Sequence, residues 1–198
     1  MVYMEIIICL VIGFLVQGGL HIWTKYMGYE MDRKFHLIGY LGSLAIWLVA
    51  FLRFDVSWTG LVLALVCSVL LTTSLIDMKY KELPDEYNLV IALLGGCFVL
   101  MYIDYWERLL FGGLIAFLIY FVLMAITGSM GAGDVKMSFG IGLFIGIILL
   151  PKWFIYTFLF GSIFAIILVI IKKKKKEDVF PFGPFMALSA IYLILFQI

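Results

Sequence analysis

Residues 56–85 read VSWTGLVLALVCSVLLTTSLIDMKYKELPD, and this stretch decides the fold. Residues 56–76 carry no charged side chain, and they are long enough to cross a bilayer, since a spanning helix needs about 20 apolar residues. The run ends on Asp77, where a short polar break begins that continues to Asp85. A charge at the edge of a membrane segment is costly unless it is used, so Asp77 is a candidate functional residue.

The same alternation of apolar runs and polar breaks extends over the whole chain. Of the 198 residues 65% are hydrophobic, and the mean hydropathy is +1.16, which is more apolar surface than a soluble domain of this size can bury. Charge-free runs cover residues 6–24, 35–52, 56–76, 87–103, 109–133, 137–151, 153–171 and 179–198.

One continuous helix over residues 137–171 would be over about 50 Å long, against a hydrocarbon core of about 30 Å, so Pro151-Lys152 is expected to form a turn between two helices. The sequence therefore predicts an all-α fold, a polytopic membrane helix bundle with about eight transmembrane helices. No soluble domain is evident, and residues 1–198 are expected to form a single integral-membrane domain.

The basic residues are distributed unevenly between the two sides of this bundle. Eleven of the 14 Lys and Arg residues fall in alternate breaks, at 21–34, 77–86, 128–136 and 172–178. The positive-inside rule assigns these breaks, and with them Asp77 and Asp134, to the cytoplasm.

Two further features were interpreted from their place in this topology. The Lys172–Lys176 run directly follows a span, which indicates an anchor at the lipid headgroups rather than a nucleic-acid patch, so no nucleic acid is expected as a partner. Trp58, Trp106 and Trp153 are expected at the opposite interface of the membrane.

The second conspicuous break reads Gly131-Ala-Gly-Asp-Val-Lys136 and carries Asp134. Two carboxyl groups a few ångströms apart resist double ionisation and share one proton, which is the basis of aspartic-protease chemistry. Gly131 and Gly133 allow the backbone to approach a substrate or the partner carboxylate closely. Lys136 either tunes the nearby carboxylates or anchors the loop at the headgroups, and Asp85 is expected to be a helix N-cap.

At these residues the chain resembles the type IV prepilin peptidase family, a group of GxGD membrane aspartic peptidases. Three motifs match in order: Ser74-Leu-Ile-Asp77 with Leu83-Pro84-Asp85, then Gly131-Ala-Gly-Asp134, then Pro181-Phe-Gly183-Pro184. The resemblance implies that Asp77 and Asp134 are the catalytic pair, activating a water between them. It implies supporting roles for Lys136, Pro181, Gly183 and Pro184, beside those of Gly131 and Gly133.

The resemblance also implies the substrate and the cellular location. The substrates would be prepilins or pseudopilins, which have a short basic leader and then an apolar helix embedded in the lipid bilayer, and the cut would remove the leader. The enzyme would be a multi-pass protein of the prokaryotic inner membrane with its site on the cytoplasmic side. No metal and no cofactor are expected.

One departure from the family pattern affects a second activity. Many bacterial members carry an insertion with paired Cys-x-x-Cys motifs between the first two spans, and they also N-methylate the new N-terminus. Here the corresponding loop, residues 21–34, is short and has no cysteine, which predicts a short, peptidase-only form. Cys9, Cys67 and Cys97 lie in apolar runs and are expected to be packing residues, while His21 and His36 are expected to be interface histidines.

Three alternatives remain at the level of the sequence. Another GxGD intramembrane protease would place its first aspartate within a helix and carry a different C-terminal motif. A small proton-coupled transporter would use Asp77 and Asp134 as proton relays. An inactive assembly protein would keep the fold without the activity.

Overall fold

The computed structural model describes residues 2–128, 130–172 and 181–198, and within these ranges it contains helices and no strands. The all-α prediction is therefore confirmed. The expected lysine anchor at 172–176 falls mainly outside the described residues. The elements are α1 (Val2–Tyr26), α2 (Arg33–Phe54), α3 (Trp58–Tyr80), α4 (Asp85–Met101), η1 (Ile103–Tyr105), α5 (Trp106–Thr127), α6 (Ala132–Lys172) and α7 (Gly183–Phe196).

Five helices of the described chain are long and apolar enough to cross a membrane: α1, α2, α3, the η1–α5 segment and α6. α4 and α7 are shorter, with 17 and 14 residues. The expected count of about eight spans is therefore not confirmed, although the helical bundle is.

The expected turn at Pro151-Lys152 is wrong, because both residues lie inside α6. The break lies instead at Gly146, where φ is 62° and ψ is 176°. This region of backbone space is essentially restricted to glycine, so the residue type fixes the position of the break. Pro151 lies five residues after this break, inside the second half of α6, and the helix continues through it.

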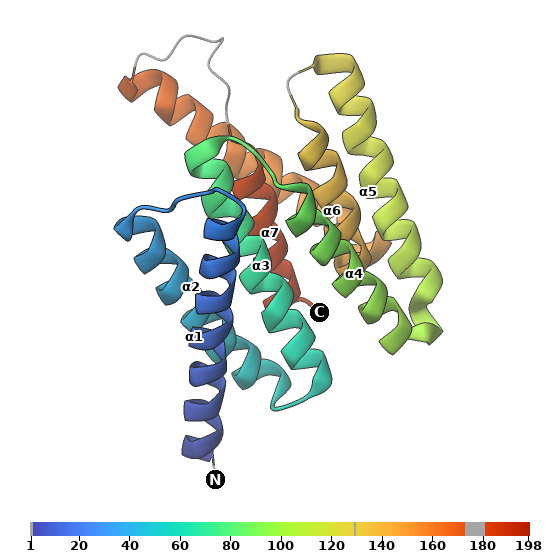
Figure 1. Cartoon of the computed structure of the whole chain (residues 1–198). Coiled ribbons are helices and arrows are strands. Elements are labelled where there is room, and N and C mark those ends of the chain that lie inside the picture. The colour runs from blue at the N-terminus through green and yellow to red at the C-terminus, as the bar shows by residue number, and fades with distance from the viewer. Residues whose placement is uncertain (1, 129, 173–180) are drawn as a thin grey trace.

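The break at Gly146 returns the second half of α6 to the end of the bundle where the first half began (Figure 1). The α1–α2, α3–α4 and α5–α6 connections lie at this same end (Figure 1). The first two of these connections are joined by hydrogen bonds. The hydroxyl of Tyr29 donates to the carboxylate of Glu82, and Nζ of Lys79 donates to the carbonyl oxygen of Glu30. At the opposite end Arg53 and Lys152 bond to Phe196 and Gln197 at the end of α7.

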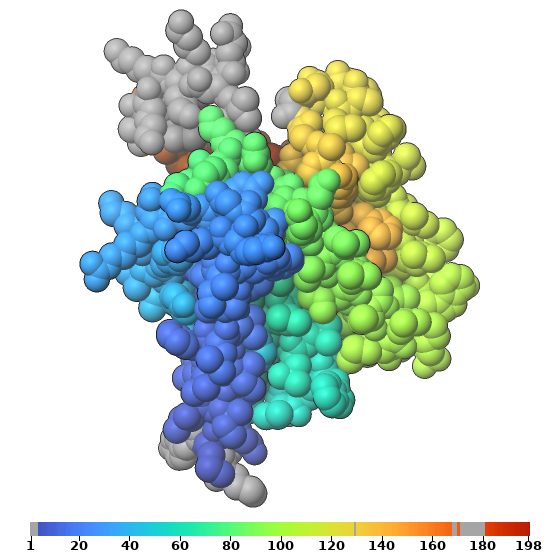
Figure 2. Space-filling model, viewed as in Figure 1, coloured from blue at the N-terminus to red at the C-terminus, as the bar shows by residue number. Residues whose placement is uncertain are grey.

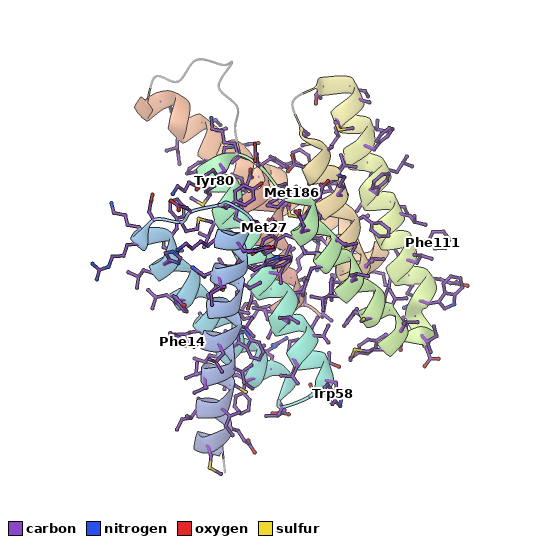
Figure 3. All side chains as sticks on the ribbon, in the orientation of Figure 1. Phe14, Met27, Trp58, Tyr80, Phe111 and Met186 are labelled. Atoms are coloured by element: carbon purple, nitrogen blue, oxygen red, sulfur yellow. The ribbon has the colours of Figure 1, made fainter. Side chains whose placement is uncertain are left out.

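Helix α3 occupies the centre of the bundle. It packs against α1, α2, α4 and α7, and almost all of its residues from Leu63 to Asp77 are buried. The outer helices instead expose large apolar side chains, and the N-terminal part of α1 extends beyond the rest of the molecule (Figure 2). In Figure 3, Phe111 lies on the outer side of α5 and Met186 lies between the helices. This apolar exterior suits a lipid environment.

Helices α5 and α6 approach each other through glycine. A side chain at Gly112 would collide with the backbone of Gly142 and Gly146, and one at Gly142 would collide with the backbone of Gly112. Gly142 and Gly146, spaced four residues apart, thus allow α6 to pack closely against α5.

Two smaller expectations need correction. Trp153 does not lie at a membrane interface, because it is fully buried and its Nε1 donates to the carbonyl oxygen of Met186. Cys97 is exposed and is not a packing residue, unlike Cys9 and Cys67.

Candidate active site

Asp77 lies in the last turn of α3, and its side chain is only 5% exposed. The helix ends soon after it because Lys81 takes a left-handed conformation, with φ 58°, and donates its N–H to the carbonyl oxygen of Asp77. The carboxylate Oδ2 accepts a hydrogen bond of 2.9 Å from the N–H of Gly183, the first residue of α7. The positive end of the α7 dipole therefore faces Asp77 and stabilises a negative charge there.

Asp134 lies in the first turn of α6 and is 7% exposed. Its Oδ2 accepts a hydrogen bond of 3.1 Å from the N–H of Gly131, just before the helix. This is one half of a capping box, since the third helical side chain reaches back to the free N–H at the helix start. Its Oδ1 is buried and bonds to none of the described residues. One carboxylate oxygen is thus fixed and the other is left for a water or a substrate.

Asp77 and Asp134 line the same cavity, which has a volume of about 520 Å³. The two carboxyl groups are close enough to interact electrostatically. The walls come from the α1–α2 and α3–α4 connections, the start of α6 and the start of α7. The lining residues are Tyr29, Asp77, Lys81, Glu82, Leu83, Pro84, Asp85, Glu86, Gly131, Gly133, Asp134, Pro181 and Phe182.

Two glycines allow the elements around the aspartates to touch. A Cβ at Gly133 would lie 2.6 Å from the Cβ of Leu83, so the α3–α4 connection can rest on the start of α6 only if residue 133 is glycine. A Cβ at Gly183 would lie 2.7 Å from Oδ2 of Asp77 and would displace the carboxylate from the amide that holds it. These glycines are where α6 and α7 approach α3 and its following loop.

The residues predicted to support the site have different roles in the structure. Pro181 lines the cavity and Gly183 holds Asp77, as described above. Pro184 is buried in the first turn of α7, where its missing N–H needs no partner. Gly131 supplies the amide that orients Asp134.

Lys136 does not contact either central aspartate. Its Nζ forms an ion pair with both carboxylate oxygens of Asp85, at 2.8 and 2.7 Å. The expectation that Asp85 is a helix N-cap is wrong, because Pro84 occupies the N-cap position and makes no side-chain cap bond, while Asp85 is the first residue of α4. The pair instead ties α4 to α6 beside the cavity.

Three residues at the site were missed by the sequence analysis. Tyr29 lines the cavity and donates to Glu82, and burial together with this carboxylate raises the pKa of its hydroxyl. Asn88 donates its side-chain N–H to the carbonyl oxygen of Gly133. Tyr120 of α5 is fully buried, and the centroid of its ring lies 6.3 Å from that of Phe182, which lines the cavity.

The expected interface histidines lie next to each other near this end of the bundle. The rings of His21 and His36 stack with centroids 4.2 Å apart, and their Nδ1 atoms face each other. In the part of the chain that the structure describes, no group of three or more His, Cys, Asp or Glu side chains is arranged to hold a metal ion.

Comparison with known proteins gives a consistent match. The sequence model of the type IV leader peptidase family matches residues 64–170. The chain is 25% identical over 158 residues to the prepilin leader peptidase/N-methyltransferase of Bacillus subtilis, covering 79% of this chain and 64% of that protein. It is 28% identical over 145 residues to the protein of the same name from Aeromonas salmonicida, covering 70% of this chain and 50% of that protein.

The chain is also 27% identical over 155 residues to the prepilin leader peptidase/N-methyltransferase of Pseudomonas aeruginosa. This match covers 72% of this chain and 52% of that protein. The matches therefore span between about half and two thirds of these relatives. No solved structure matches the chain.

Proposed function

This chain belongs to the type IV leader peptidase family, and from that premise we propose that it is a membrane aspartic endopeptidase that removes the leader from prepilins or pseudopilins. The observation that carries the proposal is the pairing of Asp77 and Asp134. Both are buried, both line one cavity, and each has one carboxylate oxygen held by a backbone N–H.

The proposed reaction uses the pair as a unit that holds one proton. The ionised carboxylate takes a proton from a water molecule as the water oxygen attacks the scissile carbonyl carbon. The protonated carboxyl gives its proton to the carbonyl oxygen, which forms a neutral tetrahedral diol. When the C–N bond breaks, the carboxyl protonated in the first step gives its proton to the leaving nitrogen, and the ionised carboxylate takes a proton from a diol hydroxyl. A carboxylic acid and an amine are released, and the pair again holds one proton. Asp134 Oδ1, which is buried without a bond to the described residues, is the atom placed to contact the water.

We place this site on the cytoplasmic side of the prokaryotic inner membrane. The connections beside the cavity carry Lys25, Lys79 and Lys81, and the opposite end carries Arg53, Arg108 and Lys152, so the positive-inside rule supports this orientation when all the breaks are counted. The scissile bond would then lie at the edge of the bilayer, where water is available.

We further propose that hydrolysis is not accompanied by methyl transfer. The relatives carry both activities in their names, but the α1–α2 connection of this chain is short and has no cysteine. A mass measurement of the new N-terminus, with S-adenosylmethionine present, tests this part: a gain of one methyl group would contradict it.

The transporter alternative receives no support from the position of the carboxylates. Asp77 and Asp134 lie in the last turn of α3 and the first turn of α6, at one end of the bundle. A proton relay requires ionisable groups distributed across the membrane.

The decisive experiment incubates the purified protein in detergent with a prepilin and measures the mass of the product. Asp77→Asn and Asp134→Asn are each expected to lower kcat by at least about a thousandfold, because each removes half of a unit that shares one proton. Asp104→Asn is the matched control, since Asp104 is exposed in η1 at the other end of the bundle. Cleavage at the normal rate by either test variant would refute the pair.

A further inference from the structure

A second cavity lies beside the one that contains the aspartates. It is a groove of about 660 Å³ on the side of the bundle, between α4 and α5. Most of its lining is apolar. The residues are Asp85, Glu86, Asn88, Leu89, Ala92, Leu114, Phe117, Lys136 and Phe139.

The groove exists because α4 and α5 both pack on α6 and hardly touch each other. Gly140 of α6 lies against Ile91 and Ala92 of α4, while Gly113 of α5 lies against Leu143 of α6. The first half of α6 is therefore the floor, and its surface is visible between α4 and α5 in Figure 2. This same half of α6 begins with Asp134.

The groove leads to the site of the two aspartates. Asp85 and Glu86 line both the groove and the catalytic cavity. Asn88, in the groove, bonds to the carbonyl oxygen of Gly133, next to Asp134. A chain segment that lies along the groove towards this end of the bundle would therefore reach the carboxylates directly.

The charge at the junction is acidic. Lys136 forms an ion pair with Asp85, so it does not neutralise the other two acidic residues near the junction of groove and cavity. These are the exposed Glu86 and the cavity residue Glu82. Among the residues lining the cavity, Lys81 is the single basic side chain beside five acidic ones. A basic segment would be attracted here, and an apolar segment would fit the groove below.

We propose that this groove holds the apolar helix of the substrate, with the basic leader passing Glu86 and Glu82 so that the junction between them reaches Asp77 and Asp134. This inference rests on the proposed function. In a bilayer the lipid tails are as apolar as the helix, so recognition depends on close packing and not on hydrophobic transfer. Ala92, a small residue on the groove wall, allows such an approach.

Photo-cross-linking tests the docking without requiring cleavage. A photoreactive amino acid replaces Leu114, which lines the groove and is 46% exposed, or Ile119, which lies on the same helix outside the groove and is 37% exposed. Both substitutions are made in the Asp134→Asn variant in lipid nanodiscs. The probe is a synthetic peptide with a Lys-rich leader, a glycine and an apolar helix long enough to cross the bilayer.

We expect the Leu114 position to capture the peptide at least about tenfold more efficiently than the Ile119 position, which corresponds to a clear preference in binding. Equal capture at both positions, or capture of lipid alone at Leu114, would overturn the groove as the docking site. Because the Asp134→Asn variant does not need to cleave, this result stays separate from the outcome for the aspartate pair.

Kinetics in the otherwise unmodified protein supply the second measurement. Leu114→Trp fills the groove and should raise KM by about tenfold, while Ile119→Trp should leave it unchanged. Glu86→Gln should lower kcat/KM about fivefold more for the Lys-rich leader than for a neutral leader. Glu107→Gln, at the exposed start of α5 away from the junction, is its control. An equal loss with both leaders would contradict a role in reading charge.

Discussion

At the scale of single residues, the site depends on backbone amides that hold one oxygen of each carboxylate. Gly183 supplies the amide for Asp77 and Gly131 supplies the amide for Asp134. Both amides belong to helix starts, where N–H groups have no partner within the helix. Both carboxylates are therefore positioned by the fold itself and not by flexible side chains.

Gly183 gives the sharpest test of this positioning. Gly183→Ala places a methyl group 2.7 Å from Oδ2 of Asp77, so the carboxylate must move. We expect kcat to fall by about a hundredfold, because a displacement near 1 Å in a catalytic group has an effect of that order. Gly19→Ala is the matched control, since a Cβ there meets nothing within 4 Å. An active Gly183→Ala enzyme with normal thermal stability would show that the amide contact is dispensable.

The shared proton also predicts the pH dependence. At low pH both carboxyls are protonated and no base remains, while at high pH both are ionised and no acid remains. A plot of kcat/KM between about pH 4 and about pH 9 should therefore be bell-shaped. A rate that stays constant on the alkaline side would mean that one ionised carboxylate is sufficient. The Asp104→Asn variant should give the same profile as the unmodified protein.

Some residues of the site could be predicted from the sequence and others could not. Asp77 and Asp134 were identifiable because each carboxylate ends or begins an apolar run. Tyr120 was not, because it lies inside the uninterrupted apolar run of residues 109–133, where one tyrosine gives no signal. The Lys136–Asp85 pair joins positions 51 apart in the chain, and its contact depends on how α4 meets α6.

At the scale of elements, the break in α6 shows the same limit. Pro151 is the stronger local signal for a turn, but the chain reverses at Gly146, where it must pass the backbone of Gly112 in α5. That contact lies between residues far apart in the sequence, so no local pattern contains it.

Paired substitutions test the position of the break. Gly146→Ala should destabilise the protein by about 1–3 kcal/mol, because alanine is strained at the observed φ of 62°. Pro151→Ala should leave stability unchanged or raise it, since the helix continues through this residue. Thermal unfolding in detergent measures both. The opposite order of effects would place the turn at Pro151.

At the scale of the whole molecule, composition and the lengths of the charge-free runs predicted a helical membrane bundle, and the structure has an apolar exterior around a buried central α3. The number of spans was harder to predict from the sequence. α4 and α7 are too short to meet the length criterion, and α6 contains two charge-free runs in one kinked helix. How such segments sit in a bilayer depends on their neighbours and not on their length alone.

Accessibility labelling tests the topology of the whole chain. In a variant without Cys9, Cys67 and Cys97, a single cysteine is placed at Lys81 or at Asp104, which lie at opposite ends of the bundle. A membrane-impermeant maleimide applied to intact cells should label position 104 and label position 81 only after lysis. Labelling of position 81 in intact cells would reverse the assigned orientation of the site.

The amide of Gly183 that holds Asp77 lies 106 residues downstream of it, beyond four further helical segments. A nascent chain that has just released Asp77 from the ribosome therefore lacks the partner that fixes this carboxylate, and Asp134 is also still to be made. On the proposed function, the chain can cleave a substrate only once α7 has been synthesised and has inserted beside α3. On the same proposal, the order of translation leaves the unfinished protein inactive while its later helices are being made.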